Sequence, residues 1–328
     1  MKILFIGGTG NISRASSALA IERGMDLYLL NRGNTSTAME GARNLKADIN
    51  DKSKVLSLIK EHYFDVVVNW IAFTPEDIQR DYELFKDHTD QYIFISSASC
   101  YQKPLSYPVI TESTPLINPF WDYSRSKIAC EDLLTNLYRQ HDFPITIVRP
   151  SLTYDTVIPV PIGGWKEYTI IDRIKKGKKI IVHGDGSSLW TITHANDFAI
   201  GFLGLIGHQQ AIGQSFHITS DEILTWNQIY DAVALAAGKQ AMKVYIPSDY
   251  LGTFDKNLRG SLLGDKAVST IFDNSKIRSF VPEFNPVIRF KDGIRNTIHW
   301  FEEKQERMII KNKTNEFMDR IINTYTRP

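Results

Sequence analysis

Cysteine is scarce in this chain, which holds only Cys100 and Cys130 among its 328 residues. Two cysteines cannot build the disulfide framework of a small secreted protein, and their spacing matches no metal-binding motif. Both are expected to be buried, reduced thiols. The sequence therefore predicts neither a disulfide scaffold nor a metal site.

An excess of charge and a long hydrophobic run are also missing. The 38 basic and 37 acidic side chains leave a formal net charge of +1, which argues against nucleic acid as a partner. No apolar run approaches the roughly 20 residues that cross a bilayer, so no membrane partner is expected. Because a strand is predicted from Lys2 onward, no room remains for a signal peptide, and we expect a cytoplasmic protein.

What the sequence does contain is a regular alternation of short apolar runs and amphipathic segments. Continuous apolar runs such as "KILFIGG" and "DVVVNW" are typical of strands buried on both faces of a parallel sheet. This alternation predicts an α/β fold, a Rossmann-type doubly wound parallel sheet with helices on both faces. We expect strands at 2–8, 26–31, 65–70, 91–96 and 144–150, a further strand-like segment at 213–220, and helices at 11–24, 52–62, 75–87 and 122–140.

The pattern loosens after Pro150, where a smaller C-terminal substrate lobe is expected. Residues 1–152, with returning segments near 180–220, are predicted to form the dinucleotide-binding domain. Residues 153–310 are predicted to form most of the substrate-binding lobe, and residues 311–328 a C-terminal helical tail. Within the lobe, 224–238 has the pattern of an amphipathic helix with Thr225 as its N-cap.

A glycine-rich turn, "IGGTGNIS", lies between the first predicted strand and helix. Gly7 and Gly10 would let backbone N–H groups approach a pyrophosphate at the helix N-terminus, where the helix dipole favours negative charge. Ser13 takes the place of a third glycine, and its small side chain predicts a slight shift of the helix with the site retained. The strand before and the helix after the turn are the context that makes this motif informative.

The second predicted strand ends in Asn31-Arg32-Gly33, where no acidic residue is present. An Asp or Glu at this point would bind the ribose hydroxyls and reject a 2′-phosphate, whereas Arg32 could pair with a phosphate. The cofactor is therefore predicted to be NAD or NADP, with a lean toward NADP. Asp48 could accept a hydrogen bond from the adenine amino group, or it could cap the helix that starts near Lys52.

Tyr123 and Lys127 lie one helical turn apart in "YSRSK". A tyrosine with a pKa of about 10 is a poor base at neutral pH, and a neighbouring ammonium group would favour its phenolate form. Ser97, in "ISSASCY", could donate a hydrogen bond at the carboxyl end of a parallel strand, where ligands bind in such sheets. The three side chains together could hold and deprotonate a substrate alcohol.

These motifs resemble the extended short-chain dehydrogenase/reductase family, in its NAD-dependent epimerase/dehydratase branch of sugar-nucleotide enzymes. The segments "VRPSLTY" (148–154), "VHGDGSSLWTITHANDFA" (182–199) and "FDNSKIRSFVPEF" (272–284) match later landmarks of that branch. The resemblance covers about residues 1–300. It implies Ser97, Tyr123 and Lys127 as catalytic residues, a sugar or nucleotide-sugar substrate, and a homodimer formed through helices 75–87 and 122–140. The cofactor-binding residues it implies are Gly7, Thr9, Gly10, Asn11, Ile12, Asn31, Arg32, Asp48, Ile49, Trp70, Ile71, Ala72, Ser96, Pro150 and Ser151.

The sequence departs from this family at two places. Trp190 stands where the branch has an arginine that clamps the substrate diphosphate, and tryptophan could instead stack on a ring. Arg259 or Lys166 could substitute for that arginine, and their spacing does not decide between them. No Asp-Glu pair follows Ser97, so dehydration is disfavoured. Ser99, Tyr154, Trp165 and Trp190 are the predicted substrate-binding residues, although Trp165 could equally pack within the lobe.

The resemblance implies an NAD(P)-dependent epimerase or reductase that acts on a hydroxyl or ketone of a sugar or nucleotide-sugar. Two alternatives use the same fold without turnover. The first is RNA binding, as in the chloroplast RNA-binding members of the superfamily, which the net charge of +1 argues against. The second is cofactor sensing, which the intact Ser97, Tyr123 and Lys127 set argues against.

Overall fold

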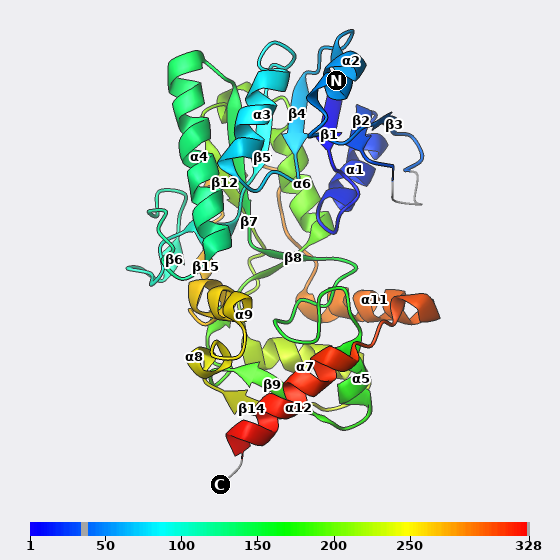
Figure 1. Ribbon diagram of the computed structural model, residues 1–328, viewed down its shortest axis with the longest axis vertical. Coiled ribbons are helices and arrows are strands. Elements are labelled where there is room, and N and C mark those ends of the chain that lie inside the picture. The colour runs from blue at the N-terminus through cyan, green and yellow to red at the C-terminus, as the bar shows by residue number, and fades with distance from the viewer. Residues whose placement is uncertain (34–38, 327–328) are drawn as a thin grey trace.

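The computed structural model describes residues 1–33 and 39–326, so the last two residues of the predicted tail lie outside its description. Its main feature is a parallel sheet of seven strands in the order β12-β7-β5-β4-β1-β2-β3 (Figure 1). The strands are β1 (Lys2–Ile6), β2 (Asp26–Asn31), β3 (Arg43–Lys46), β4 (Val66–Asn69), β5 (Tyr92–Ile95), β7 (Ile145–Pro150) and β12 (Ser215–Ile218). The predicted doubly wound α/β fold is confirmed, and β3 is the strand of this sheet that was not predicted.

Helices cover both faces of this sheet, which explains why its strands are apolar on both sides. One face packs against α2 (Lys52–Ile59), α3 (Pro75–Phe85) and α4 (Asp122–His141), and the other against α1 (Ser13–Glu22), α6 (Ala195–Leu205) and α10 (Ser275–Phe280). Alternate residues of β1 divide between the two faces. Leu4 and Ile6 face the first group of helices, and Ile3 and Phe5 face the second.

The strand order reverses at β1, whose neighbours are β2 on one side and β4 on the other. Loops that leave adjacent strands in opposite directions open a crevice at their carboxyl ends, where ligands of such sheets bind. The glycine-rich turn follows β1 at this point. The fold therefore places the turn where a dinucleotide site is expected.

The C-terminal lobe lies below the sheet in Figure 1 and has a core of its own. β9 (Lys179–His183) pairs with β14 (Met242–Ile246) in parallel. Its helices are α5 (Thr169–Lys175), α7 (Trp226–Ala236), α8 (Ser248–Leu251), α9 (Lys256–Ser261), α11 (Phe290–Glu302) and α12 (Asn312–Thr326), with a π-helical turn, η3, at Leu262–Lys266. Thr225 forms a capping box with Gln228 at the start of α7, as its N-cap prediction required.

Short elements complete the two parts and the segments between them. They are β6 (Val109–Ile110), β8 (Leu152–Tyr154), β10 (Leu189–Trp190), β11 (Ile192–His194), β13 (Leu224–Thr225), β15 (Ile271–Phe272) and the 3₁₀ turns η1 (Ala98–Cys100), η2 (Gln209–Ala211) and η4 (Gln305–Arg307). The pairing of β8 with β11 and of β6 with β15 joins segments far apart in the sequence. These pairings fix the lobe against the carboxyl edge of the sheet.

The predicted domain boundaries need two corrections. Of the segments near 180–220, β9 belongs to the C-terminal lobe, and only the part from β11 to β12 returns to the sheet domain. α10, at residues 275–280, also packs on the sheet domain. The predicted tail is helical, and its apolar side chains Met318, Ile321 and Ile322 are buried against the lobe.

Candidate active site

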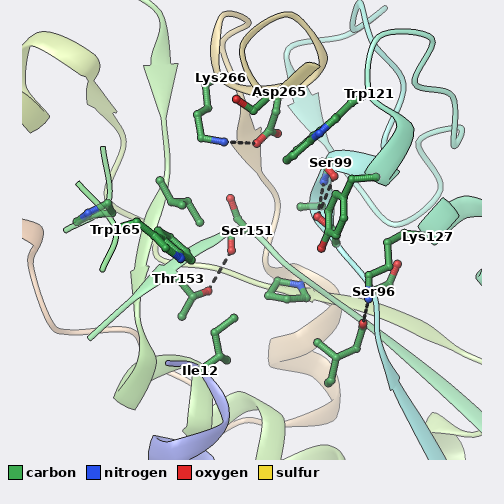
Figure 2. A pocket seen from close by; sticks show the side chains of 18 of the residues that line it. Ile12, Ser96, Ser99, Trp121, Lys127, Ser151, Thr153, Trp165, Asp265 and Lys266 are labelled. Atoms are coloured by element: carbon green, nitrogen blue, oxygen red, sulfur yellow. Dashed lines mark hydrogen bonds and ion pairs between the residues drawn. The ribbon is translucent and has the colours of Figure 1, made fainter. Parts of the chain in front are cut away.

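A cavity of about 500 Å³ lies between the carboxyl edge of the sheet and the C-terminal lobe (Figure 2). The sheet domain contributes one wall, and the lobe contributes the wall that faces it. The first wall holds Ser96, Ser97, Ser99, Tyr123 and Lys127, and the second holds Pro159, Val160, Pro161, Trp165, Ser261, Asp265 and Lys266. The predicted catalytic residues therefore share one cavity.

A hydroxyl network follows the end of β5. Ser97 is the N-cap of η1, where its Oγ accepts from the Ser99 N–H at 3.2 Å. The Oγ atoms of Ser97 and Ser99 are 2.9 Å apart, and the Ser124 hydroxyl of α4 donates to Ser99 Oγ at 2.7 Å. This chain of hydroxyls holds Ser97 in place at the cavity surface.

Tyr123 begins the first turn of α4 and reaches the cavity beside Ser97. Burial raises the pKa of its phenol, and the charge on a Cys100 thiolate would raise it further, while a hydrogen bond with Ser97 lowers it. The resulting pKa of Tyr123 lies above the ordinary value of a tyrosine. The phenol is therefore protonated at neutral pH in this structure.

Lys127 is buried, with only 2% of its surface exposed. Its Nζ donates to the main-chain oxygens of Ala72 at 2.7 Å and Ile95 at 2.8 Å. Burial lowers the pKa of Lys127 to about 8. Nζ lies 5.9 Å from the centroid of the Tyr123 ring, so the ammonium is close to the phenol.

The predicted effect of Lys127 on Tyr123 needs a correction. The sequence led us to expect a phenol whose pKa is lowered by the ammonium. In the structure, burial raises the pKa of Tyr123 and lowers that of Lys127. The phenol is therefore in its protonated form at neutral pH.

A buried ion pair lies behind this wall. Arg149 of β7 donates to both carboxylate oxygens of Glu131 on α4, with Nη2–Oε2 at 2.6 Å. The Ser96 hydroxyl donates to the same carboxylate. Sequence analysis missed this pair, although two charged residues within otherwise apolar, regular elements were a usable signal. The pair fixes α4, and with it Tyr123 and Lys127, against the sheet.

A second cavity, of about 380 Å³, lies beside the glycine-rich turn. Gly7 has φ 97°, and an added Cβ would lie 3.2 Å from Ile71 Cγ2, so the turn keeps an open cradle that a side chain would fill. The Ser13 hydroxyl accepts from Gly10 N–H at 2.8 Å and lies where close packing is needed. The buried Asn11 Oδ1 and Trp70 Nε1 have no protein partner among the described residues. These features fit a dinucleotide.

The predicted cofactor-binding residues divide among these surfaces. Seven line the second cavity: Gly7, Thr9, Asn31, Arg32, Asp48, Ile49 and Ile71. Five line the first: Ile12, Trp70, Ser96, Pro150 and Ser151. Gly10 and Asn11 line a third, adjacent cavity, and Ala72 contributes its main-chain oxygen to Lys127. Asp51, and not Asp48, is the N-cap of α2, so the capping role considered for Asp48 is wrong.

Two predicted substrate contacts need correction. Tyr154 is fully buried among Phe290 and His194, and it does not line the cavity. Trp190 is 1% exposed and packs against Trp226, with ring centroids 5.5 Å apart. Both side chains complete the core of the lobe, which their positions in a motif could not reveal. Ser99 and Trp165 do line the cavity.

Sequence analysis missed the lobe residues Asp265 and Lys266, which lie on the π-helical turn η3. Asn118 joins this turn to the opposite wall, because its Nδ2 donates to Gly264 O at 2.7 Å and to Ser99 O at 2.8 Å. No signal in the sequence brings these segments together. Their proximity depends on the packing of the lobe against the sheet domain.

Two further classes of site are absent from residues 1–33 and 39–326. Across these ranges, no group of three or more His, Cys, Asp or Glu side chains could hold a metal ion. None of the helices in the same part of the chain has the length and hydropathy to cross a membrane.

Comparisons with known proteins agree with the fold. The sequence model of the "NAD dependent epimerase/dehydratase family" matches residues 3–219. The chloroplast stem-loop binding protein of 41 kDa b of Arabidopsis thaliana is 26% identical over 308 residues, which cover 89% of this chain and 78% of that protein. The 2′-dehydrokanamycin reductase of Streptomyces kanamyceticus is 20% identical over 76% of this chain and 70% of its own.

Solved structures of similar fold include the UDP-glucuronic acid 4-epimerase of Bacillus cereus in complex with UDP-glucuronic acid and NAD. It superposes with a TM-score of 0.74 over 92% of this chain and 99% of its own, at 19% sequence identity. The likeness extends beyond the sheet domain into the C-terminal lobe.

Proposed function

Because the chain belongs to the NAD-dependent epimerase/dehydratase family, we propose that it is an NAD(P)-dependent reductase or epimerase acting on a hydroxyl or ketone of a sugar. The observation that carries this proposal is the meeting of Ser97, Tyr123 and Lys127 in one cavity beside the glycine-rich turn. When bound, the nicotinamide cofactor supplies or accepts a hydride. The protein must hold the substrate oxygen and move its proton.

Tyr123 Oη is the group that exchanges a proton with the substrate oxygen. Its pKa is raised by burial, so the phenol is protonated at neutral pH and has a proton to give to the oxygen of a ketone as that oxygen becomes an alcohol. Ser97 Oγ donates a hydrogen bond to the same oxygen and stabilises the charge that develops on it. Lys127 donates to the main-chain carbonyls of Ala72 and Ile95 and so keeps these two segments in place beside the site. The same groups would serve hydride transfer in either direction.

The cofactor preference is proposed to be NADP, on the chemistry of the turn after β2. Arg32 is exposed and lines the second cavity. Lys46 lies against the same turn, since a Cβ on Gly33 would be 2.6 Å from Lys46 Cε. Two cations at this corner suit a 2′-phosphate better than two free hydroxyls. Asp48 lines the same cavity, where its carboxylate accepts from Asn50 N–H and is proposed to accept also from the adenine amino group.

Dehydration is not expected of this site. Elimination of water needs an acid or base beside the carbon that loses the hydroxyl, in addition to the group that removes the first proton. Ala98 and Ser99 follow Ser97, and Asp265 is the only carboxylate among the described residues that line the cavity. Asp265 pairs with Lys266 on the far wall. The proposal is therefore limited to hydride transfer, with or without epimerisation.

RNA binding is the second candidate function, because one relative is by its printed name a stem-loop binding protein. A chain with net charge +1 would need a local basic surface to bind RNA. Affinity for an RNA hairpin that falls steeply with salt, together with no hydride transfer, would favour this candidate.

A homodimer is proposed from the family resemblance, with α3 and α4 forming the contact. The two helices pack side by side on one face of the sheet (Figure 1). Sedimentation at micromolar concentration tests this, and a monomer would contradict it.

The proposed function is tested with NADPH and NADH that carry deuterium at the transferring position. The protein is incubated with either cofactor and a panel of keto-sugars, and products are analysed by mass. We expect one deuterium in a sugar alcohol, dependent on Tyr123. Separately, the nucleotide released by denaturing fresh protein is identified: retained NAD points to an epimerase, and an empty site points to a reductase. No deuterium transfer from either cofactor, together with no conversion of any sugar into its epimer, would contradict the proposal.

A further inference from the structure

Two tryptophans define the substrate end of the main cavity. Figure 2 shows Trp121 and Trp165 on opposite sides of it, with the Asp265–Lys266 pair between them. Trp165 is 45% exposed, which is unusual for so large an apolar side chain at the rim of a cavity. Trp121 lies at the start of α4, directly before the turn that carries Tyr123. Aromatic faces in such a position contact the C–H face of a sugar ring.

The backbone at Trp165 is held in a conformation that a tryptophan rarely adopts. Its φ is 61°, in the left-handed region that costs a non-glycine residue roughly 1–3 kcal/mol. Two main-chain hydrogen bonds with Ile158, at 2.9 and 2.6 Å, keep it there. Strain of this kind persists where a side chain is held in one position for a function. Here it fixes the backbone that carries the indole at the cavity rim.

Cations that could receive a diphosphate are already paired. Among the described residues that line the cavity, the basic ones are Lys127 and Lys266. Lys127 Nζ donates to two main-chain oxygens, and Lys266 Nζ lies 3.2 Å from Asp265 Oδ2 and 5.5 Å from the centroid of the Trp121 ring. A diphosphate would enter this wall without an unpaired positive partner.

The backbone of the π-helical turn is held in place at Gly264 and Lys266. The Lys266 carbonyl accepts from Trp226 Nε1 at 3.0 Å and lies 3.2 Å from His183 Nε2. The Gly264 carbonyl accepts from Asn118 at 2.7 Å. π-helical turns are frequent at functional sites, and this one holds a carboxylate and an ammonium side by side. The pair offers one acceptor and one donor to a neutral, hydroxyl-bearing ligand.

The space is also limited. The cavity of about 500 Å³ is shared with five residues that are expected to contact the cofactor. Pockets of about 300–1,000 Å³ accommodate a drug-sized ligand, so the part left for substrate suits one ring better than a nucleotide-sugar. Volume, charge and aromatic lining therefore point to the same class of ligand.

We propose that the substrate is a neutral, single-ring sugar or glycoside without a diphosphate, held between Trp121 and Trp165 with its hydroxyls on Asp265 and Lys266. This inference rests on the proposed function, because it concerns the substrate of the same cavity. The sequence led us to expect a nucleotide-sugar, whereas the lobe wall is here proposed to recognise a sugar without a diphosphate.

The test is a binding titration of the full chain saturated with NADP⁺ or NAD⁺. Methyl glucoside, methyl galactoside and methyl mannoside are compared with UDP-glucose and UDP-galactose, and binding is followed by intrinsic tryptophan fluorescence and by calorimetry. We expect at least one methyl glycoside to bind and the UDP-sugars to bind at least about tenfold more weakly. Trp165→Ala should weaken glycoside binding about 3- to 10-fold, and Trp165→Phe should restore most of it.

Tyr245→Ala is the matched control, since Tyr245 lies on β14, is 42% exposed and lines none of the three cavities described above. It should leave glycoside affinity unchanged. The inference is overturned if UDP-glucose binds as tightly as every methyl glycoside, if no glycoside binds, or if Trp165→Ala has no effect. Glycoside binding without hydride transfer would contradict the proposed function and leave the substrate class standing. Hydride transfer with UDP-sugars alone would support the proposed function and contradict the proposed substrate class.

Discussion

The two walls of the main cavity differ in how they are built. Ser97, Tyr123 and Lys127 lie at the end of β5 and in the first turns of α4, so regular elements of the sheet domain position them. Trp165 and the Asp265–Lys266 pair lie in a loop and in a π-helical turn of the lobe. Under the proposed function the first wall transfers a proton, and under the proposed substrate class the second wall selects the ligand. On these proposals, rigid elements carry the chemistry and their connections carry the selectivity.

This comparison predicts a large loss of turnover from the sheet wall with little loss of binding. Tyr123→Phe removes the proton that the substrate oxygen exchanges, so we expect kcat to fall about 10³-fold while cofactor affinity changes little. Single-turnover kinetics and a cofactor titration measure the two quantities. Tyr154→Phe is the control, because Tyr154 is buried in the lobe core outside the cavity. Equal losses in both variants, or full activity of Tyr123→Phe, would remove Tyr123 from its role.

The contact between the walls can be broken at Asn118. Asn118→Leu removes both donors that link Ser99 O and Gly264 O, and it leaves two buried carbonyls without a partner. We expect the free energy of unfolding to fall by about 2–4 kcal/mol and KM for the substrate to rise about tenfold. Denaturant unfolding and steady-state kinetics measure these effects.

Asn274→Leu is the matched control for the Asn118→Leu variant. Asn274 is equally buried and its Nδ2 donates to Thr219 O at 2.9 Å, away from the cavity. The control should lose stability and keep its KM. If both variants keep their KM, Asn118 has only a structural role.

The sequence predicted the sheet wall better than the lobe wall, for a physical reason. Tyr123 and Lys127 are one helical turn apart, and Ser97 follows an apolar strand, so local spacing alone put them near one another. Asp265 and Lys266 reach the cavity only because Trp226, His183 and Asn118 hold a distant segment there. No local pattern encodes such contacts.

Trp190 and the pKa values illustrate the same limit. Its position in a motif suggested a ligand contact, whereas the aromatic packing of the lobe buries it against Trp226. The spacing of Tyr123 and Lys127 gave their proximity, but the direction of their pKa shifts depends on how completely the fold removes water. Proximity was readable from the sequence, and burial was not.

The lobe wall should lose stability in acid through His183. Burial lowers the pKa of His183 to about 4, and a hydrogen bond to the Lys266 carbonyl opposes this shift in part. Because the folded pKa lies below the ordinary 6.5, His183 contributes stability above pH 6.5 that is lost as the pH falls toward 4. The contribution is about 3 kcal/mol at most.

His183→Gln should therefore flatten the fall in unfolding free energy between pH 6.5 and pH 4, as measured by urea unfolding at a series of pH values. The control His299→Gln should keep the slope of the unaltered protein, because the His299 side chain is 78% exposed. An unchanged slope in His183→Gln would show that the histidine is not held neutral by the lobe.

The smallest effect is expected at the second cavity, where the exposed turn that carries Arg32 is proposed to select NADPH over NADH. Arg32→Ser should weaken NADPH binding about 5- to 10-fold and leave NADH binding nearly unchanged, because an exposed ion pair contributes only about 1 kcal/mol. Lys46→Ser should act in the same direction, since its stem lies against Gly33. Arg43→Ser is the control on the same strand, where Arg43 pairs with Asp26. Fluorescence titrations with both cofactors measure the ratio. Equal losses for NADH and NADPH would mean that the corner contacts the shared part of the cofactor, and that this loop, unlike the loops of the lobe, has no part in selection.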